Sequence, residues 1–231
     1  MTEDFFEKLL NFGPECQVER VEVNSENEVD IYLKWNLDCY KKQNKKRFEF
    51  VHDYLDYRRW RHLDILQFKT FINAKIPRVK HTDSKIESIK TPWAQSRRHH
   101  TYLFETYTIE MLLATKNQTK TTQMLRCGFN LVNNIMHNAT QRGSERRDSN
   151  KVYKHLGIDE KSFQKGHNYV SDLSEQENGI IIDVVKDRTK EVTKTMLNNT
   201  LSEFQKPKLR NSDNYRNSTL RIASASTILA I

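Results

Sequence analysis

The sequence predicts an α+β protein of several domains, and three patterns in its 231 residues carry this prediction. Apolar and polar residues alternate over residues 17–91, which is typical of strands. Helical spacing replaces this alternation over residues 92–143. Residues 155–231 begin with a strand, a hairpin and a helix, which is how a mixed α/β domain starts. A short helix within residues 1–16 and a polar linker over 144–154 complete the predicted organisation.

The first two segments are predicted from hydrophobic spacing and turn residues. Residues 3–12 carry apolar side chains at helical spacing after two acids, which predicts an amphipathic helix. The stretch "VERVEVNSENEVDIYLKW" predicts two strands joined by a turn at 24–27. "CYKKQNKKRF" is expected to be a basic loop. "RRWRHLDILQFKTFINAKIPRVK" predicts two more strands, with an end at Pro77.

Three helices are predicted after Pro92, and the last two resemble a helix-turn-helix in outline. The first is "TYLFETYTIEMLLAT", in which one mostly apolar face carries Tyr102, Leu103, Thr106, Ile109, Glu110 and Leu113. The second covers residues 117–125 and ends before Gly128, and the third covers 130–140. Two short helices joined by a turn containing glycine are the outline of a DNA-binding helix-turn-helix. An ordinary helical bundle fits the same pattern equally well.

The third predicted helix separates an apolar face from a face rich in asparagine. Its inward residues are Leu131, Val132, Ile135 and Met136, and its outer residues are Asn130, Asn133, Asn134, His137 and Asn138. Amide side chains can hydrogen-bond both to base edges and to phosphates. The predicted base contacts are therefore Asn130, Asn133, Asn134 and His137.

The charge of the chain favours a polyanionic partner. Lys and Arg number 38 against 30 Asp and Glu, for a net charge of +8. Residues 41–100 contain sixteen Lys and Arg against six Asp and Glu, with aromatic residues interleaved. Such a surplus suggests nucleic acid, although a solvated basic face is the alternative. The predicted phosphate contacts are Arg58, Arg59, Arg61, Lys69, Arg97 and Arg98, whereas Trp60 and Trp93 are expected to pack in cores.

Several protein classes are disfavoured by composition. The mean hydropathy is −0.81, and no apolar run approaches the 18 residues of a membrane helix. The N-terminus lacks the basic and apolar regions of a signal peptide. The three cysteines, Cys16, Cys39 and Cys127, form no disulfide framework and fit a reducing compartment. We expect a cytoplasmic, nucleoid-associated protein with no membrane partner.

Three separated motifs together resemble one protein family. They are "YRRWRHLDILQFKTFINAKIPRVK" at 57–80, "TPWAQSRRHHTYLFE" at 91–105 and "GIDEKSFQKGHNYVSDLSEQENGIIIDVVKDRT" at 157–189. In this order they resemble the zinc-ribbon region, the segment before the helix-turn-helix and the start of the catalytic domain of the ISL-three family of bacterial insertion-sequence transposases. The resemblance covers about residues 18–205 and rests on the order of the three motifs.

The resemblance implies a ribonuclease H-like catalytic domain of the DDE type, of which this chain holds the N-terminal part. The first strand of such a domain ends in an aspartate that helps to bind two divalent ions, Mg²⁺ or Mn²⁺, and Asp159 matches that position. Neighbouring residues of a strand face opposite sides, so Glu160 is expected to face away and to pair with Lys161 or Lys165. Without the resemblance, both acids read as ordinary residues at a strand end.

The sequence departs from the family pattern at both of its metal sites. Of the four zinc ligands, Cys39 matches the first and His81 the third, whereas Lys42 and Ser84 replace the others. His52 is a further candidate, but the structural zinc is expected to be lost and the remaining site to be weak. Asp213 has the spacing of the second catalytic acid but lacks the apolar flanks of a buried strand. The third acid would lie beyond Ile231, which suggests a frameshift or truncation near residue 206.

The resemblance and the charge together predict a DNA transposase. An intact protein of this kind would bind the inverted repeats that end its element, as double-stranded DNA, and would cut and join strands, with a homo-oligomer assembled on the DNA. This chain is expected to be a truncated or degenerate copy that is catalytically incomplete. The alternative is a DNA-binding fragment or regulator without catalytic activity. For RNA there is no support beyond the charge.

Overall fold

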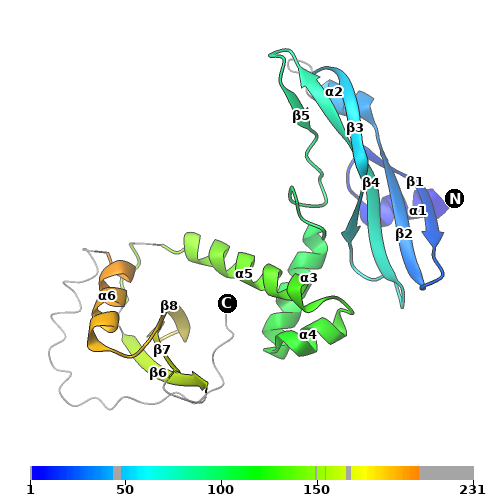
Figure 1. Cartoon of the computed structure of the whole chain (residues 1–231). Helices are drawn as coiled ribbons and strands as arrows, with labels where there is room; N and C mark the ends of the chain where they lie inside the picture. Colours follow the sequence, from blue (N-terminus) through cyan, green and yellow to red (C-terminus); the bar gives the residue numbers. More distant parts are fainter. Residues whose placement is uncertain (1, 44–47, 149, 154, 165–167, 203–231) are drawn as a thin grey trace. The chain divides into compact units, whose positions relative to one another are not determined.

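The computed structural model describes residues 2–43, 48–148, 150–153, 155–164 and 168–202 (Figure 1). The chain forms two compact units, which are described separately. The first unit comprises residues 1–111 and 121–128, and the second comprises residues 112–120 and 129–231. The described residues hold two sheets and six helices, so the predicted α+β class is confirmed. None of these helices is long and apolar enough to cross a membrane.

A five-stranded sheet forms the first unit. Its strands are β1 (Cys16–Val23), β2 (Glu28–Trp35), β3 (Phe48–Arg61), β4 (Lys69–His81) and β5 (Ile86–Ser88). The order is β1-β2-β4-β3, and β5 also pairs with β4. β2 and β4 run parallel, whereas the other pairs are antiparallel. The predicted strands and the turn between β1 and β2 are found, but β3 begins before the predicted stretch that starts at Arg58, and β5 was not predicted.

One face of this sheet carries the core of the first unit. Ile31, Ile72 and Ala74 are fully buried there. Helix α1 (Thr2–Leu10) contributes Leu10 to the same core. Trp60 and Trp93 are also buried, with their ring centroids 5.5 Å apart at a steep angle. The prediction that these two tryptophans pack in the core is confirmed.

The first half of the segment expected to be a basic loop, residues 39–43, belongs to a helix, α2 (Leu37–Gln43). Asn36 begins it, because its side-chain oxygen accepts a hydrogen bond from the Cys39 amide at 3.3 Å. Asp38 lies in the first turn and Lys41 and Lys42 in the last, so these charges complement the helix dipole. The sequence reading took these lysines for loop residues, whereas in the structure they stabilise the C-terminal end of a helix.

Strand β4 continues through Pro77, where the sequence predicted an end. β2 pairs with β4 only as far as Ala74, and β5 pairs from Arg78 onward. The Pro77 carbonyl accepts a hydrogen bond from the Ile89 amide at 3.0 Å at this junction. The missing N–H of Pro77 therefore removes no hydrogen bond between β2 and β4.

Helix α3 (Tyr102–Thr115) buries a different face from the predicted one. Its fully or nearly fully buried residues are Phe104, Thr108 and Leu112, at intervals of four. Tyr102, Leu103 and Leu113, which share the predicted apolar face, are 42–51% exposed. Apolar residues occur all around this helix, so hydrophobic spacing alone could not select the buried face.

Two further helices follow, α4 (Gln118–Met124) and α5 (Phe129–Glu145). Val132 and Ile135 of α5 are fully buried, as the sequence predicted. Asn130, Asn134 and His137 are exposed on its other side. α5 runs five residues further than the predicted end at Thr140, into the start of the polar segment.

A three-stranded antiparallel sheet lies in the second unit. Its strands β6 (Leu156–Gln164), β7 (Asn168–Glu175) and β8 (Ile180–Lys186) follow one another in space as in sequence. Helix α6 (Lys190–Thr200) comes next, with Thr189 accepting a hydrogen bond from the Val192 amide as its N-cap. Leu173 and Met196 are buried. The predicted sequence of strand, hairpin and helix is confirmed.

Candidate nucleic-acid interface and acidic site

Three of the predicted phosphate contacts gather beside the edge strand β3. The loop before α3 is pinned to this strand, because the Arg61 amide donates to the His99 carbonyl and the Thr101 amide donates to the Arg61 carbonyl, each at 2.9 Å. Arg58 reaches the same loop, where its Nη2 donates to the Arg98 carbonyl at 3.0 Å. Arg97 is exposed and lies in the left-handed region with φ of 64°. The sheet therefore groups Arg58, Arg97 and Arg98 at one edge.

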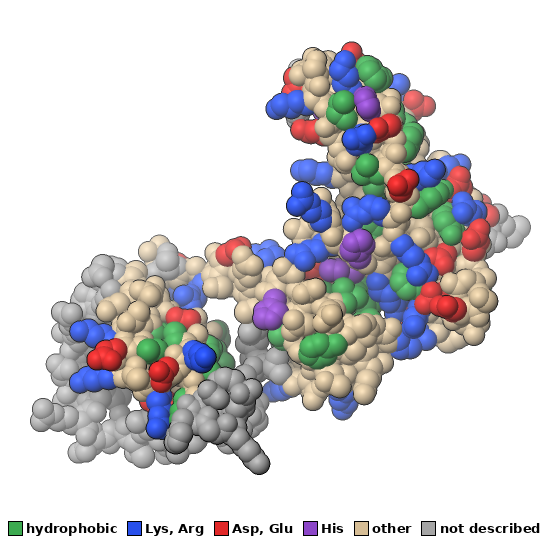
Figure 2. All heavy atoms as spheres, viewed as in Figure 1, with side chains coloured by type: hydrophobic (Ala, Val, Ile, Leu, Met, Phe, Trp, Pro, Cys, Tyr) green, Lys and Arg blue, Asp and Glu red, His purple; other side chains and the backbone are tan. Residues whose placement is uncertain are grey.

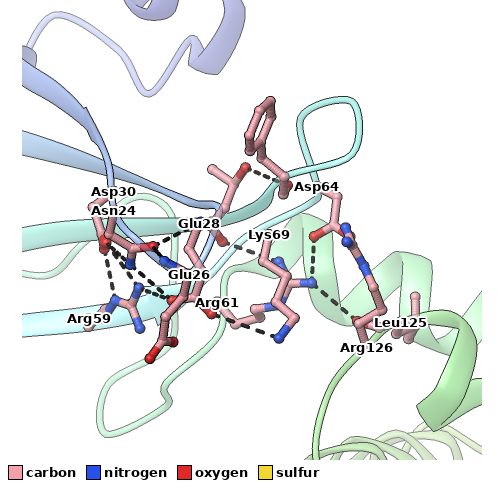
Figure 3. A network of polar contacts seen from close by, with 12 residues as sticks. Asn24, Glu26, Glu28, Asp30, Arg59, Arg61, Asp64, Lys69, Leu125 and Arg126 are labelled. Carbon is pink, nitrogen blue, oxygen red and sulfur yellow. Dashed lines mark hydrogen bonds and ion pairs between the residues drawn. The ribbon is translucent and has the colours of Figure 1, made fainter.

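Arg59 and Lys69 are held by acids on the sheet face opposite the core (Figure 3). The Arg59 guanidinium bonds Asp30 and Glu28 at 2.8 Å each and lies 3.4 Å from the centroid of the Phe71 ring. Lys69 Nζ is 3.8 Å from Glu28. The hydrogen bond from Arg59 holds the pKa of Glu28 below its usual value. The two cations are thus partly neutralised within the protein.

Arg61 has a structural place in the first unit. Its side chain is 6% exposed. Its Nη1 donates to the carbonyls of His62 and Thr70, and its Nη2 donates to the Leu125 carbonyl at 3.1 Å (Figure 3). Asp64 pairs with the same guanidinium. A phosphate could reach Arg61 only by breaking these bonds, so we leave it out of the proposed phosphate contacts.

Figure 2 shows how Asp and Glu side chains lie among the Lys and Arg side chains over the first unit.

Helix α5 presents part of its predicted base-reading face. Asn130, Asn134 and His137 are exposed, whereas Asn133 is partly buried. The Asn133 side-chain oxygen accepts a hydrogen bond from Gln118 Nε2 at 3.2 Å. Asn138 donates to the Asn134 backbone carbonyl, so it leaves the Asn134 side chain unengaged. Exposed amides and a histidine on one helix can form hydrogen bonds to base edges.

Asp159 lies in the middle of β6, whereas the sequence placed it at a strand end. The strand continues to Gln164, and Asp159 faces Asp172 of β7 in the register of the sheet. Its side chain is 26% exposed and its carboxylate lies 3.5 Å from Lys161 Nζ. Glu160 is exposed and points to the other face, as predicted. Lys161 pairs with Asp159 instead of Glu160, because residues two apart on a strand share a face.

Asp172 is an acidic residue that the sequence reading missed. Burial raises its pKa above the ordinary value for aspartate, and the negative charge of Asp159 adds to this shift while Lys161 opposes it. The sequence could have indicated Asp172, since pairing β6 with β7 places Asp159 and Asp172 opposite each other. The site therefore holds two carboxylates and one ammonium group on one face of the sheet.

Replacing Asp172 with Asn is expected to raise the melting temperature near neutral pH. Because the folded-state pKa is raised above the usual 3.8, the ionised carboxylate is disfavoured in the folded protein. Wild-type stability therefore falls as the pH rises through the range just above that value. Thermal unfolding near pH 7 and near pH 3 tests this, and we expect a gain only at the higher pH. A lower melting temperature near neutral pH would show that the ionised form stabilises the fold.

These carboxylates fit a divalent cation in part. Carboxylate oxygens are the ligands that Mg²⁺ prefers, and it keeps several waters, so few protein ligands are needed. Within the described residues, no group of three or more His, Cys, Asp or Glu could hold a metal ion. Asp213, the second predicted catalytic acid, lies outside the described residues.

The predicted zinc ligands Cys39 and His81 have other neighbours. Cys39 Sγ accepts a hydrogen bond from Gln43 Nε2 at 3.8 Å on α2. His81 is buried at the end of β4, with Nε2 3.7 Å from Glu87. His52 pairs with Asp53 at 3.2 Å. Neither predicted ligand belongs to a three-residue metal group in the described part of the chain. The weak zinc site stays a prediction.

Comparison with known proteins places the second unit in context. The family model for ISL3-type DDE proteins, described as transposase, matches residues 156–211. Two relatives, both described as the transposase for insertion sequence element IS1557, come from the CDC 1551 and H37Rv strains of Mycobacterium tuberculosis. Each is 26% identical over 125 residues, which cover 54% of this chain and 28% of the relative. No solved structure gives a significant match.

Proposed function

We propose that the chain acts in DNA transposition as a member of the ISL3 family of insertion-sequence transposases, because the model of that family matches residues 156–211. Its partner in this proposal is double-stranded DNA, at the inverted repeats that end the element, and it assembles there with further copies of itself. Such a protein works in the cytoplasm, on the nucleoid. The observation that carries the proposal is that the family match begins at β6, the strand that holds Asp159.

The proposed catalytic domain is ribonuclease H-like. Three antiparallel strands in the order β6-β7-β8, followed by a helix, agree with the start of such a domain. Asp159 is the proposed first metal ligand, Asp172 is the nearest further carboxylate, and Asp213 is the proposed second acid. When bound, Mg²⁺ or Mn²⁺ would activate a water and stabilise the leaving oxygen of a phosphodiester. Lys161 would have to release Asp159 for a cation to bind there.

The proposed DNA contacts come from a helix of the second unit and, separately, from a cationic edge of the first unit. α4 and α5 form the helix-turn-helix, and Asn130, Asn133, Asn134 and His137 of α5 read bases in the major groove. The proposed phosphate contacts are Arg58, Arg97 and Arg98, which lie on the first unit beside β3. Arg59 and Lys69 contribute less, because Glu28 and Asp30 share their charge.

The arginine contacts are tested by the salt dependence of DNA binding. We expect affinity for a labelled duplex to fall steeply between about 50 and 200 mM salt, since cations on the protein release counterions from DNA. Arg97→Ala and Arg98→Ala should each reduce the slope of the logarithmic plot by about 1. Lys85→Ala is the matched control, because Lys85 is 71% exposed on the turn after β4 and belongs to no proposed contact. An unchanged slope in both arginine variants would remove this edge from the proposal.

A second candidate function is a DNA-binding regulator without cleavage. The ion pair between Lys161 and Asp159 favours it, because a neutralised carboxylate binds a cation less readily. Nicking of a supercoiled plasmid in the presence of Mn²⁺ separates the two functions. Cleavage that Asp159→Asn abolishes supports the enzyme, whereas specific binding with no nicking in either protein supports the regulator.

A further inference from the structure

The side-chain amide of Gln118 connects α4 to the base-reading helix α5. Its Nε2 donates to Asn133 Oδ1 at 3.2 Å and lies 2.9 Å from the sulfur of Met136. All three residues belong to the second unit, and all three side chains are partly buried. Gln118 thus uses one nitrogen to contact two residues, one of which is a predicted base contact.

Met136 fixes which way the Gln118 amide is turned. A thioether sulfur accepts hydrogen bonds weakly and cannot donate them, so it favours the NH₂ group as its neighbour. The reversed amide would place Gln118 Oε1 against the sulfur, with two electron-rich atoms in contact. With Nε2 beside Met136, the atom of Asn133 that faces Gln118 must be an acceptor, which is Oδ1.

This orientation leaves Asn133 with donors for a partner outside the protein. Its oxygen is engaged by Gln118, whereas its Nδ2 makes no hydrogen bond within the part of the chain that the structure describes. The Asn133 side chain is partly exposed. An asparagine free to use both atoms reads adenine, donating to N7 and accepting from N6. Because Oδ1 of Asn133 faces Gln118, the atom that Asn133 presents outward is the donor Nδ2.

We propose that Gln118 is a positioning residue that turns the donor of Asn133 toward the DNA, which favours guanine, with its two acceptors, over cytosine at one position of the DNA site. Guanine presents two acceptors in the major groove, O6 and N7, whereas cytosine presents a donor. The inference rests on the proposed binding of double-stranded DNA through α5. It adds a base preference and a residue of α4 that sets this preference without touching the DNA.

The test is a selection from a library of random duplexes with the full chain and with Gln118→Glu. The carboxylate of the variant can only accept, so Asn133 must turn its NH₂ group inward and its oxygen toward the DNA. We expect guanine at one position of the selected motif to change to cytosine or adenine, which offer donors. The ratio of guanine to cytosine there should fall on the order of 10-fold or more.

Gln123→Glu is the matched control for added charge. Gln123 lies on α4 and is exposed, so this substitution adds the same charge while it keeps the Gln118 amide. We expect its motif to keep guanine, even where overall affinity falls. Melting temperatures of all variants show whether each one is folded.

Asn133→Asp tests the same inference if Gln118→Glu does not fold. An aspartate can still accept the hydrogen bond from Gln118, but it has no donor to offer outward. Its motif should therefore favour cytosine, whose amino group donates to a carboxylate. A shift in both variants supports the proposal, whereas a shift in Asn133→Asp alone, with folded Gln118→Glu unchanged, shows that Asn133 contacts a base but overturns the role of Gln118.

The selection experiment distinguishes a failure of the Gln118 proposal from a failure of the proposed DNA binding. A motif that keeps the same base in folded Gln118→Glu and in Asn133→Asp overturns the role of Gln118 and leaves DNA binding intact. If the folded wild-type chain enriches no motif, the proposed sequence-specific binding fails, and the role of Gln118 falls with it.

Discussion

Replacing Arg61 with Met is expected to lower the free energy of unfolding of the first unit by about 1–3 kcal/mol. The substitution removes one of two arginine partners of the Asp64 carboxylate, which keeps its ion pair with Arg126. It also leaves the carbonyls of His62, Thr70 and Leu125 without the guanidinium that they share. Buried polar groups that lose their hydrogen bonds keep the cost of desolvation, which is the larger part of this effect.

Urea unfolding followed by tryptophan fluorescence measures this change, because Trp35, Trp60 and Trp93 all lie in the first unit. Arg97→Met is the control, since an exposed arginine should change stability by no more than about 0.5 kcal/mol. If Arg61→Met is as stable as this control and also reduces the salt slope of DNA binding, Arg61 contacts phosphate, as its sequence context suggests.

Substituting Asn134 with Ala is expected to relax the sequence preference of DNA binding by about 5- to 150-fold. The Asn134 side chain is exposed on α5, and its backbone carbonyl alone accepts the hydrogen bond from Asn138. The substitution therefore removes a proposed base contact and leaves that helix bond in place. Affinity for an unrelated duplex should hardly change, since phosphate contacts dominate non-specific binding.

Competition between a selected duplex and a scrambled duplex measures this preference. Gln141→Ala provides the comparison, because Gln141 is an exposed amide of the same helix that bonds Glu145. An unchanged ratio of affinities in Asn134→Ala would exclude Asn134 as a base contact. An equal loss in both variants would point to a general weakening of α5.

The alternation of apolar and polar residues predicted the strands that are joined by recognisable turn residues. The β1–β2 hairpin around Asn24–Asn27 and the β7–β8 hairpin before Gly179 are both found where alternation and turn residues placed them. The helix α2 was missed because lysines and a glutamine suit both loops and helix ends. The buried face of α3 was misjudged because apolar side chains surround that helix. Contacts from outside the segment select the buried face of α3, whereas α2 begins at a local cap, Asn36, that the sequence reading overlooked.

In the candidate site, too, the sequence did not show which charged side chains are engaged by other residues of the fold. Arg59, Arg61 and Arg97 look alike in the sequence, yet acids and carbonyls from elsewhere in the fold engage the first two. Asp30, which binds Arg59, is 29 residues away along the chain. Likewise, Asp159 was identified by resemblance, while its cross-strand neighbour Asp172 becomes apparent only with the register of β6 and β7. Residue type predicted phosphate binding by arginines and cation binding by aspartates. Pairing between strands determined which of these side chains are free to bind.

The most direct test of the account is the affinity of the full wild-type chain for a selected duplex relative to a scrambled duplex of the same composition. Fluorescence anisotropy at about 150 mM salt gives both dissociation constants under conditions that suppress non-specific binding. We predict a preference of roughly 1,000-fold or more for the selected sequence, as specific DNA-binding proteins show. Equal affinity for the two duplexes would contradict sequence-specific recognition by α5.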